Sequence, residues 1–198
     1  MPNRLAEEVR KLDELKGEAR GAGLKNNIEF VIQKEGEDAV RKIEDEMEKV
    51  GYPIKYKGIR AMAFYPLSLE AALLLVINKL FDYNSKDFQE MGRFGAKSSL
   101  IIKLFTRYFI SFERFKSKPP EMWRKYFSVG EVKLQEFNEE EKYAVVKLKD
   151  FKLNKLHCSL LLGFFSSLLE IMIREKVKGE EAKCPFDGDE HHEFLLKW

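Results

Sequence analysis

A chain of 198 residues has the size of a single domain with room for a small appendage. Its hydrophobic content of 44%, including 16 phenylalanines, is enough for a sizeable core, and 35 basic against 33 acidic side chains leave a net charge of only +2. That balance, together with the lack of a basic stripe interleaved with aromatic residues, argues against nucleic acid as a partner.

The first twenty residues are highly charged and contain no apolar run, so they do not read as a secretory signal. We therefore expect a cytoplasmic protein in a reducing compartment, where a disulfide between Cys158 and Cys184 is the less expected use of the two thiols. The most apolar windows are shorter than the roughly 20 residues that cross a bilayer, so no membrane span is predicted.

Residues 1–57 are predicted to form an N-terminal helical segment, and residues 58–198 the main, ligand-binding domain. An amphipathic helix is expected over residues 4–20, because four apolar residues recur there at helical spacing among charges. These residues are Leu5, Val9, Leu12 and Leu15. Such a helix either binds a partner or lies on its own domain, and the pattern does not distinguish the two.

Further helices are expected before the main domain and at its start. Two of them end at Gly36 and near Gly51, where glycine closes an apolar-periodic run. A helix over residues 68–83, with Ser68 as its N-cap, is apolar nearly all round and should therefore be central. The next helical stretch, from Ser85 onwards, is expected to loosen near Gly92 and Gly95, and a short helix follows two prolines at 119 and 120.

The C-terminal third alternates apolar and polar residues, which is the pattern of strands. The stretches at 130–138 and 142–151 form one predicted hairpin, and a long apolar helix follows at about 154–175. An Asp-Gly turn at Asp187 and Gly188 predicts a second hairpin. The order predicts an α+β fold in which several helices pack on a four-stranded antiparallel sheet, with an N-terminal helical extension.

The motifs of common enzyme classes are missing from the sequence. A phosphate-binding loop would need glycine before Lys97, where Ala96 stands, and no nucleophile elbow, HExxH helix or dinucleotide fingerprint occurs. The Tyr-x-Ser-x-Arg pattern of haem-based nitric-oxide sensors is also lacking around Tyr65 and Ser68, so haem is not predicted. These absences predict a protein that is not an enzyme.

The scarce soft side chains gather near the C-terminus. Only two cysteines and three histidines occur in the chain. The hairpin should bring Cys184 and His192 together, with Glu181 close by, and the long helix can present Cys158 to them. Two thiolates, an imidazole and a carboxylate suit a closed, structural zinc site. The alternatives are a buried cysteine that acts as a small hydrophobe, exposed turn histidines, and His191 in place of His192.

The last forty or so residues resemble the C-terminal half of the 4-vinyl reductase domain family. The family pattern is a cysteine, a glycine-marked apolar helix, Glu-x-x-Cys, a Gly-Asp turn, and a further cysteine before Phe. The matching residues are Cys158, Gly163, Glu181, Cys184, Gly188, Asp189 and Phe194. In the aromatic-sensing domains of phenol-responsive regulators this set holds zinc. This chain departs from the pattern at the fourth ligand, where His192 replaces cysteine.

The resemblance also implies a fold related to nitric-oxide-signalling ligand domains and to subunits of Golgi vesicle-tethering complexes. Such domains have a hydrophobic pocket between helices and sheet, and they commonly form homodimers. We therefore expect a module that binds or senses an apolar or aromatic molecule and passes the signal to a partner protein. The alternative is a dimeric scaffold or tether without a ligand. Candidate lining residues, each of which is otherwise simple core packing, are Phe64, Tyr65, Phe94, Phe105, Phe109 and Trp123.

Overall fold

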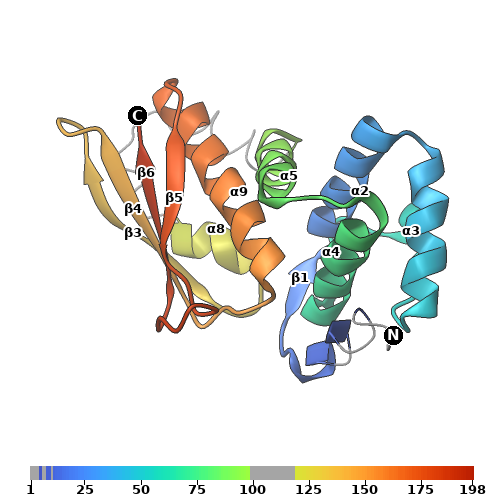
Figure 1. The fold of residues 1–198 in the computed structure, drawn as a ribbon. Coiled ribbons are helices and arrows are strands. Elements are labelled where there is room, and N and C mark those ends of the chain that lie inside the picture. The colour runs from blue at the N-terminus through green and yellow to red at the C-terminus, as the bar shows by residue number, and fades with distance from the viewer. Residues whose placement is uncertain (1–4, 6–7, 10, 99–118) are drawn as a thin grey trace.

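The computed structural model describes residues 5, 8–9, 11–98 and 119–198. A helical lobe stands beside a lobe built on an antiparallel sheet, and helix α5 (Ser85–Ser98) lies between them (Figure 1). One hydrophobic core runs from Leu5 to Leu196 and therefore joins the two lobes. The predicted α+β class is confirmed.

From residue 11 onwards, the helical lobe consists of three longer helices, two short 3-10 turns and a small two-stranded sheet. The helices are α2 (Gly21–Glu35), α3 (Asp38–Lys49) and α4 (Leu67–Phe81). The turns and strands are η1 (Lys11–Glu14), β1 (Glu18–Arg20), η2 (Tyr56–Gly58) and β2 (Phe64–Pro66). Helix α4 is the centre of this lobe, as its composition predicts, because its apolar residues are buried on all sides.

The predicted amphipathic helix over residues 4–20 is replaced in part by η1 and β1. Gly17 has a φ of 101°, a backbone conformation that ends helices, and β1 then pairs antiparallel with β2. The apolar stripe is nevertheless used, because Leu5, Val9 and Leu12 are buried in the protein's own core. This placement favours the second of the two alternatives for the stripe.

The sheet lobe carries four antiparallel strands in the order β3-β4-β6-β5. The strands are β3 (Glu131–Asn138), β4 (Tyr143–Lys149), β5 (Lys178–Lys183) and β6 (His192–Lys197). The two predicted hairpins are therefore present, and β6 enters between β4 and β5 through pairs such as Val146 with Phe194. Helices α8 (Pro119–Tyr126) and α9 (Lys155–Ile173) complete the lobe.

Helices α5 and α9 cross in backbone contact because each has a glycine at the crossing. A Cβ on Gly92 would lie 1.9 Å from the carbonyl oxygen of Leu160, and a Cβ on Gly163 would lie 1.9 Å from that of Gln89. Gly92 was expected to loosen its helix, but it lies inside the continuous α5. Its role is steric, since only glycine allows two helices to approach this closely.

Helix α9 is long and apolar enough, by length and composition, to cross a membrane. It packs on α5 and on β5, and many of its residues are buried within the protein. Core helices of soluble proteins pass the same test, so this one helix is weak evidence for a membrane span.

Candidate functional site

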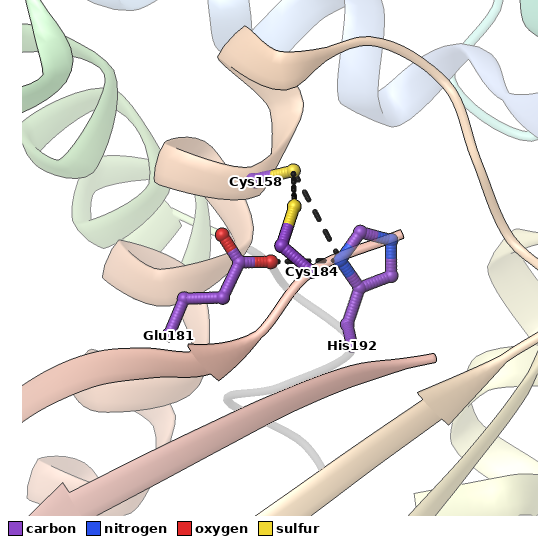
Figure 2. A group of neighbouring side chains, drawn as sticks. All are labelled: Cys158, Glu181, Cys184 and His192. Atoms are coloured by element: carbon purple, nitrogen blue, oxygen red, sulfur yellow. Dashed lines mark hydrogen bonds and ion pairs between the residues drawn. The ribbon is translucent and has the colours of Figure 1, made fainter. Parts of the chain in front are cut away.

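Four side chains from α9 and the β5–β6 hairpin converge where α9 begins beside that hairpin (Figure 2). Cys158 comes from α9, Glu181 from β5, Cys184 from the loop after β5, and His192 from the start of β6. Their ligand atoms all lie within 4.8 Å of one another. The structure therefore brings together all four residues that the sequence singled out as metal ligands.

The fourth member of this soft-ligand cluster is His192 and not its neighbour. The His192 ring is buried, with Nδ1 3.9 Å from Cys158 Sγ. His191 comes just before β6 and does not belong to the cluster; its Nε2 lies 3.6 Å from Glu193 Oε2. The alternation of side chains along a strand explains why adjacent histidines have separate surroundings.

The ring of His192 is held by its second nitrogen. Nε2 lies 2.9 Å from the carbonyl oxygen of Phe151, which can only accept, so Nε2 carries the hydrogen of this bond. Nδ1 therefore points its lone pair, or a second proton, at Glu181 Oε1, which is 2.8 Å away. If the imidazole is neutral and the carboxyl is ionised, a lone pair on Nδ1 faces a lone pair on Oε1, and the two repel each other. A proton or a metal cation between the two atoms would remove this repulsion.

The two sulfur atoms lie 3.7 Å apart and are not bonded. Two thiolates that bind one tetrahedral metal ion with bonds of about 2.3 Å lie about 3.8 Å apart, so the spacing suits shared coordination. Burial, reinforced by the charge of Glu181, raises the pKa of the Cys158 thiol, and burial also raises the pKa of Cys184. Without a cation, both groups are therefore neutral thiols near pH 7.

The turn of the hairpin shapes the cluster. The backbone nitrogens of Asp187 and Asp189 donate to the carbonyl of Cys184, and Asp189 Oδ2 accepts from the Cys184 nitrogen at 2.8 Å. A register shift between Glu181 and Lys183 interrupts the ladder just before this turn. Such bulges re-aim side chains, and here the irregularity adjoins both Glu181 and Cys184.

A second feature, an apolar cavity of about 140 Å³, lies on the other side of the start of α9. Its walls come from α5, α8, α9 and the sheet, with α2 and α4 at one end. Apolar side chains such as Met91, Val146 and Leu161 line most of it. The lining also contains polar side chains, of which three at the α2 and α4 end are buried, namely Asn27, Glu70 and His157.

These three buried polar residues are not among the predicted site residues. Burial raises the pKa of Glu70 to about 7, with the Asn27 amide opposing the shift, and burial lowers the pKa of His157 to about 3. The one sequence signal for them is Glu70, a charged residue inside the otherwise apolar stretch of α4. Asn154 brings α9 to α4, since its side chain accepts from the His157 nitrogen and donates to the Ala71 carbonyl.

The predicted lining residues have different positions. Trp123 lines the cavity, and its Nε1 donates to the Val129 carbonyl at 2.8 Å. Phe64 is exposed in β2 beneath Arg20, and Tyr65 beside it accepts from the Arg60 nitrogen. Phe94 contacts Phe30, with ring centroids 5.9 Å apart. Phe64, Tyr65 and Phe94 are not among the residues that line the cavity, and Phe105 and Phe109 lie outside the described residues.

Comparison with solved structures shows which known folds this chain is similar to. An H-NOX protein from S. oneidensis in the Fe(II)NO ligation state is similar with a TM-score of 0.67 at 13% identity, over 90% of this chain and 98% of that one. The Fe(II) unliganded H-NOX protein from K. algicida gives 0.64 at 17%, over 90% and 95%. A structure from a study of haem redox potential and porphyrin distortion gives 0.62 at 13%, over 90% and 99%. No family model and no curated protein matches the sequence.

These similarities support the expected relation to the nitric-oxide-signalling fold, and nothing in them supports the 4-vinyl reductase family. They also correct the prediction of zinc as the cofactor. The similar structures are H-NOX proteins, and their descriptions name iron ligation states and haem, so the fold points to haem rather than zinc. At these identities, the likeness establishes the fold alone.

The described residues do not fit a haem. The cavity of about 140 Å³ is well below the roughly 300–1,000 Å³ of sites for drug-sized ligands, and haem is larger than most of these. No lysine or arginine is found among the described lining residues to face its two carboxylates. The Tyr-x-Ser-x-Arg pattern is matched in part at Tyr126 and Ser128, but Gly130 stands at the position of its arginine. Gly130 has a φ of 84°, and a Cβ there would lie 3.0 Å from Trp123.

Proposed function

We propose that this protein is a non-catalytic sensor module that binds a compact apolar or aromatic molecule in the cavity between α5, α8, α9 and the sheet. The observation that carries the proposal is the cavity itself, because close packing normally leaves few voids of this size in a core. The similarity of the whole fold to H-NOX domains supports a module that binds small molecules.

The size of the cavity limits the ligand. An apolar cavity of about 150 Å³ engineered in another protein stays dry and accommodates benzene. The volume of about 140 Å³ here therefore suits a molecule with one ring and few substituents. The mostly apolar lining would stabilise such a ligand by removing its surface from water.

The alternative function, a dimeric scaffold without a ligand, would require a large exposed apolar face. Within the described part of the chain, the exposed large hydrophobic residues are Met62 at 60% and Phe64 at 39%. Two neighbouring residues make a small patch compared with a stable dimer interface. This part of the surface therefore favours the ligand-binding function.

Tryptophan fluorescence tests the proposal directly. The chain has two tryptophans, and Trp198 is not among the residues that line the cavity but stacks on Phe137 with centroids 5.1 Å apart. A Trp198→Phe variant leaves Trp123, which lines the cavity, as the single reporter. Small single-ring molecules should change its emission saturably and raise the melting temperature, whereas a Trp123→Phe variant should show no such fluorescence change. A flat titration and an unchanged melting temperature would refute the cavity as a binding site.

We also propose that the soft-ligand cluster holds a metal ion that ties α9 to the β5–β6 hairpin. The carrying observation is the 2.8 Å approach of His192 Nδ1 to Glu181, with two buried sulfurs alongside. A cation between them would remove the lone-pair repulsion and allow the thiols to ionise. Four protein ligands would fill a tetrahedral site, which supports a structural role.

Adjacent histidines provide a matched test of the metal proposal. Elemental analysis of protein purified without added metal should find about one metal ion per chain, whichever metal it is. His192→Ala should lose that metal and melt at lower temperature, while His191→Ala should keep it. Metal-free wild-type protein with the same stability in chelator, or equal metal retention in both variants, would contradict the proposal.

Four further expectations stay predictions. They are the boundary between residues 57 and 58, a homodimer, a signalling partner protein and a cytoplasmic location. The β1–β2 pair crosses that boundary in space, so expression of residues 58–198 alone is an informative test. Light scattering measures the oligomeric state.

A further inference from the structure

We propose that Glu70 and Asn27 form a recognition subsite for a single hydroxyl group on the ligand, so that the bound molecule is a compact neutral alcohol and not a plain hydrocarbon. This inference rests on the proposed ligand-binding function and specifies its ligand class. The two residues lie at the end of the cavity where α2 and α4 meet the start of α9.

The carboxyl of Glu70 is buried without sufficient partners. The residue is 4% exposed and lines the cavity, and its Oε2 has no hydrogen-bond partner among the described residues. His157 is a titratable neighbour, with its Nε2 3.9 Å from Glu70 Oε1. Buried polar groups are almost always satisfied, so an acceptor left open toward a cavity indicates a missing partner.

The side chain of Asn27 supplies the complementary atom. Asn27 is also 4% exposed and lines the same end of the cavity, and its Nδ2 donor has no hydrogen-bond partner within the described part of the chain. Its amide favours the ionised form of Glu70, but no bond of standard geometry joins the two groups. An open donor therefore stands beside an open acceptor.

Gly23 leaves room at this point. It precedes Asn27 by one turn of α2, and a Cβ on Gly23 would lie 3.2 Å from Glu70 Oε1. A larger side chain would crowd the carboxyl.

A hydroxyl is the smallest group that satisfies both open atoms, because it donates one hydrogen bond and accepts another. Its hydrogen would go to Glu70 Oε2, and its oxygen would accept from Asn27 Nδ2. A hydrocarbon would leave both groups unpaired in a site now closed to water, which is costly. An ammonium group only donates, so it would leave Asn27 unpaired.

Three probes of similar size separate the ligand classes: cyclohexanol, methylcyclohexane and cyclohexylamine, which is protonated at the assay pH. Binding to the full chain is measured by Trp123 fluorescence in the Trp198→Phe background and by calorimetry. Cyclohexanol should bind at least about tenfold more tightly than methylcyclohexane, since a site built for a hydrogen bond rejects the analogue that lacks it.

Two variants at one position make the test specific. Glu70→Leu should reduce the preference for cyclohexanol over methylcyclohexane to about twofold or less. Glu70→Gln keeps a carbonyl acceptor and should retain most of that preference. A leucine variant that keeps the full preference would overturn the assignment of Glu70.

The outcomes separate this inference from the function on which it rests. If methylcyclohexane binds wild-type protein as tightly as cyclohexanol, the hydroxyl subsite is refuted and the sensor function stands. If cyclohexylamine binds most tightly, the subsite recognises a cation and the inference is wrong. If none of the probes binds, the proposed function fails together with the subsite.

Discussion

His157 and Cys158 are consecutive residues at the start of α9, yet they belong to two differently built sites. Cys158 joins the soft-ligand cluster, where two sulfurs, a ring nitrogen and a carboxylate converge within 4.8 Å. His157 lines the cavity, where polar atoms stand in an apolar wall and two of them lack partners among the described residues. Successive residues of a helix point about 100° apart, so one helix end can serve both sites.

The contrast shows that the surroundings of unpaired polar atoms can distinguish a metal site from a ligand-binding cavity. In the cluster, the four ligand atoms lie within 4.8 Å of one another, so the component that we propose for this site is a small cation. In the cavity, an unpaired donor and an unpaired acceptor belong to lining residues, so the component that we propose for this site is a molecule. Four substitutions test this comparison, beginning with the largest expected effect.

Gly163→Ala should break both sites at once, because α9 carries a residue of each. The added methyl would lie 1.9 Å from the Gln89 carbonyl, so α5 and α9 must separate. We expect the free energy of unfolding to fall by about 3 kcal/mol or more. Urea unfolding measures this loss. Gly95→Ala is the matched control, since its methyl meets only a distant Asn26 atom and alanine favours the helix by about 1 kcal/mol. Equal effects of the two variants would contradict the close crossing.

Glu70→Gln isolates the cavity site. With a folded-state pKa of about 7 against an ordinary value of 4.5, Glu70 keeps its proton longer in the folded state. Its contribution to stability therefore falls as pH rises from about 4.5 to about 7, and the loss is complete above that range. Glutamine cannot ionise, so the variant should be about 3 kcal/mol more stable than wild type at pH 8, with little gain near pH 4.5.

The buried neighbours of Glu70 do not reverse this sign. His157 is neutral throughout the range because burial lowers its pKa to about 3, and Asn27 does not titrate. Unfolding curves at pH 4.5, 6 and 8 check the prediction. A stability difference that stays the same at all three pH values would show that the carboxyl of Glu70 is paired after all.

Asn154→Ala should weaken both sites by a smaller amount, since Asn154 caps α9 and holds it to α4. Loss of an N-cap costs about 1 kcal/mol, and the lost bond to the Ala71 carbonyl adds to it. Asn154→Asp keeps the capping oxygen and loses only the donor, so thermal unfolding should place it between wild type and the alanine variant. An aspartate variant as unstable as the alanine variant would show that the cap contributes nothing.

Lys155→Ala should have the smallest effect. Lys155 pairs with Asp187 across the two elements that carry the cluster, but both side chains are exposed. Exposed ion pairs contribute little because water and salt screen them. We expect an unchanged melting temperature and an unchanged metal content. A clear loss of metal would mean that this surface pair, and not packing, positions the hairpin.

Much of the fold could be predicted from local pattern. The alternating residues of β3 and β4, the Asp-Gly turn and the apolar run of α4 each specify an element without knowledge of its neighbours. The four cluster residues were found because cysteine and histidine are rare in this chain, so their grouping stood out. The apolar spacing of residues 4–20 predicts one helix. The strand β1 forms instead because it pairs with β2, which is distant in sequence and leaves no signal in the local pattern.

The sequence by itself determined the element types, the α+β class and which residues could meet around the hairpin, because these follow from periodicity, turn chemistry and rarity. Only the tertiary structure decided that His192 and not His191 joins the cluster. It also decided that α5 and α9 are in backbone contact at Gly92 and Gly163, and that Trp123 lines the cavity. It also placed Glu70 opposite Asn27, two residues from helices separated by more than thirty positions. Burial and unpaired atoms arise from the packing of distant segments, and no local pattern records them.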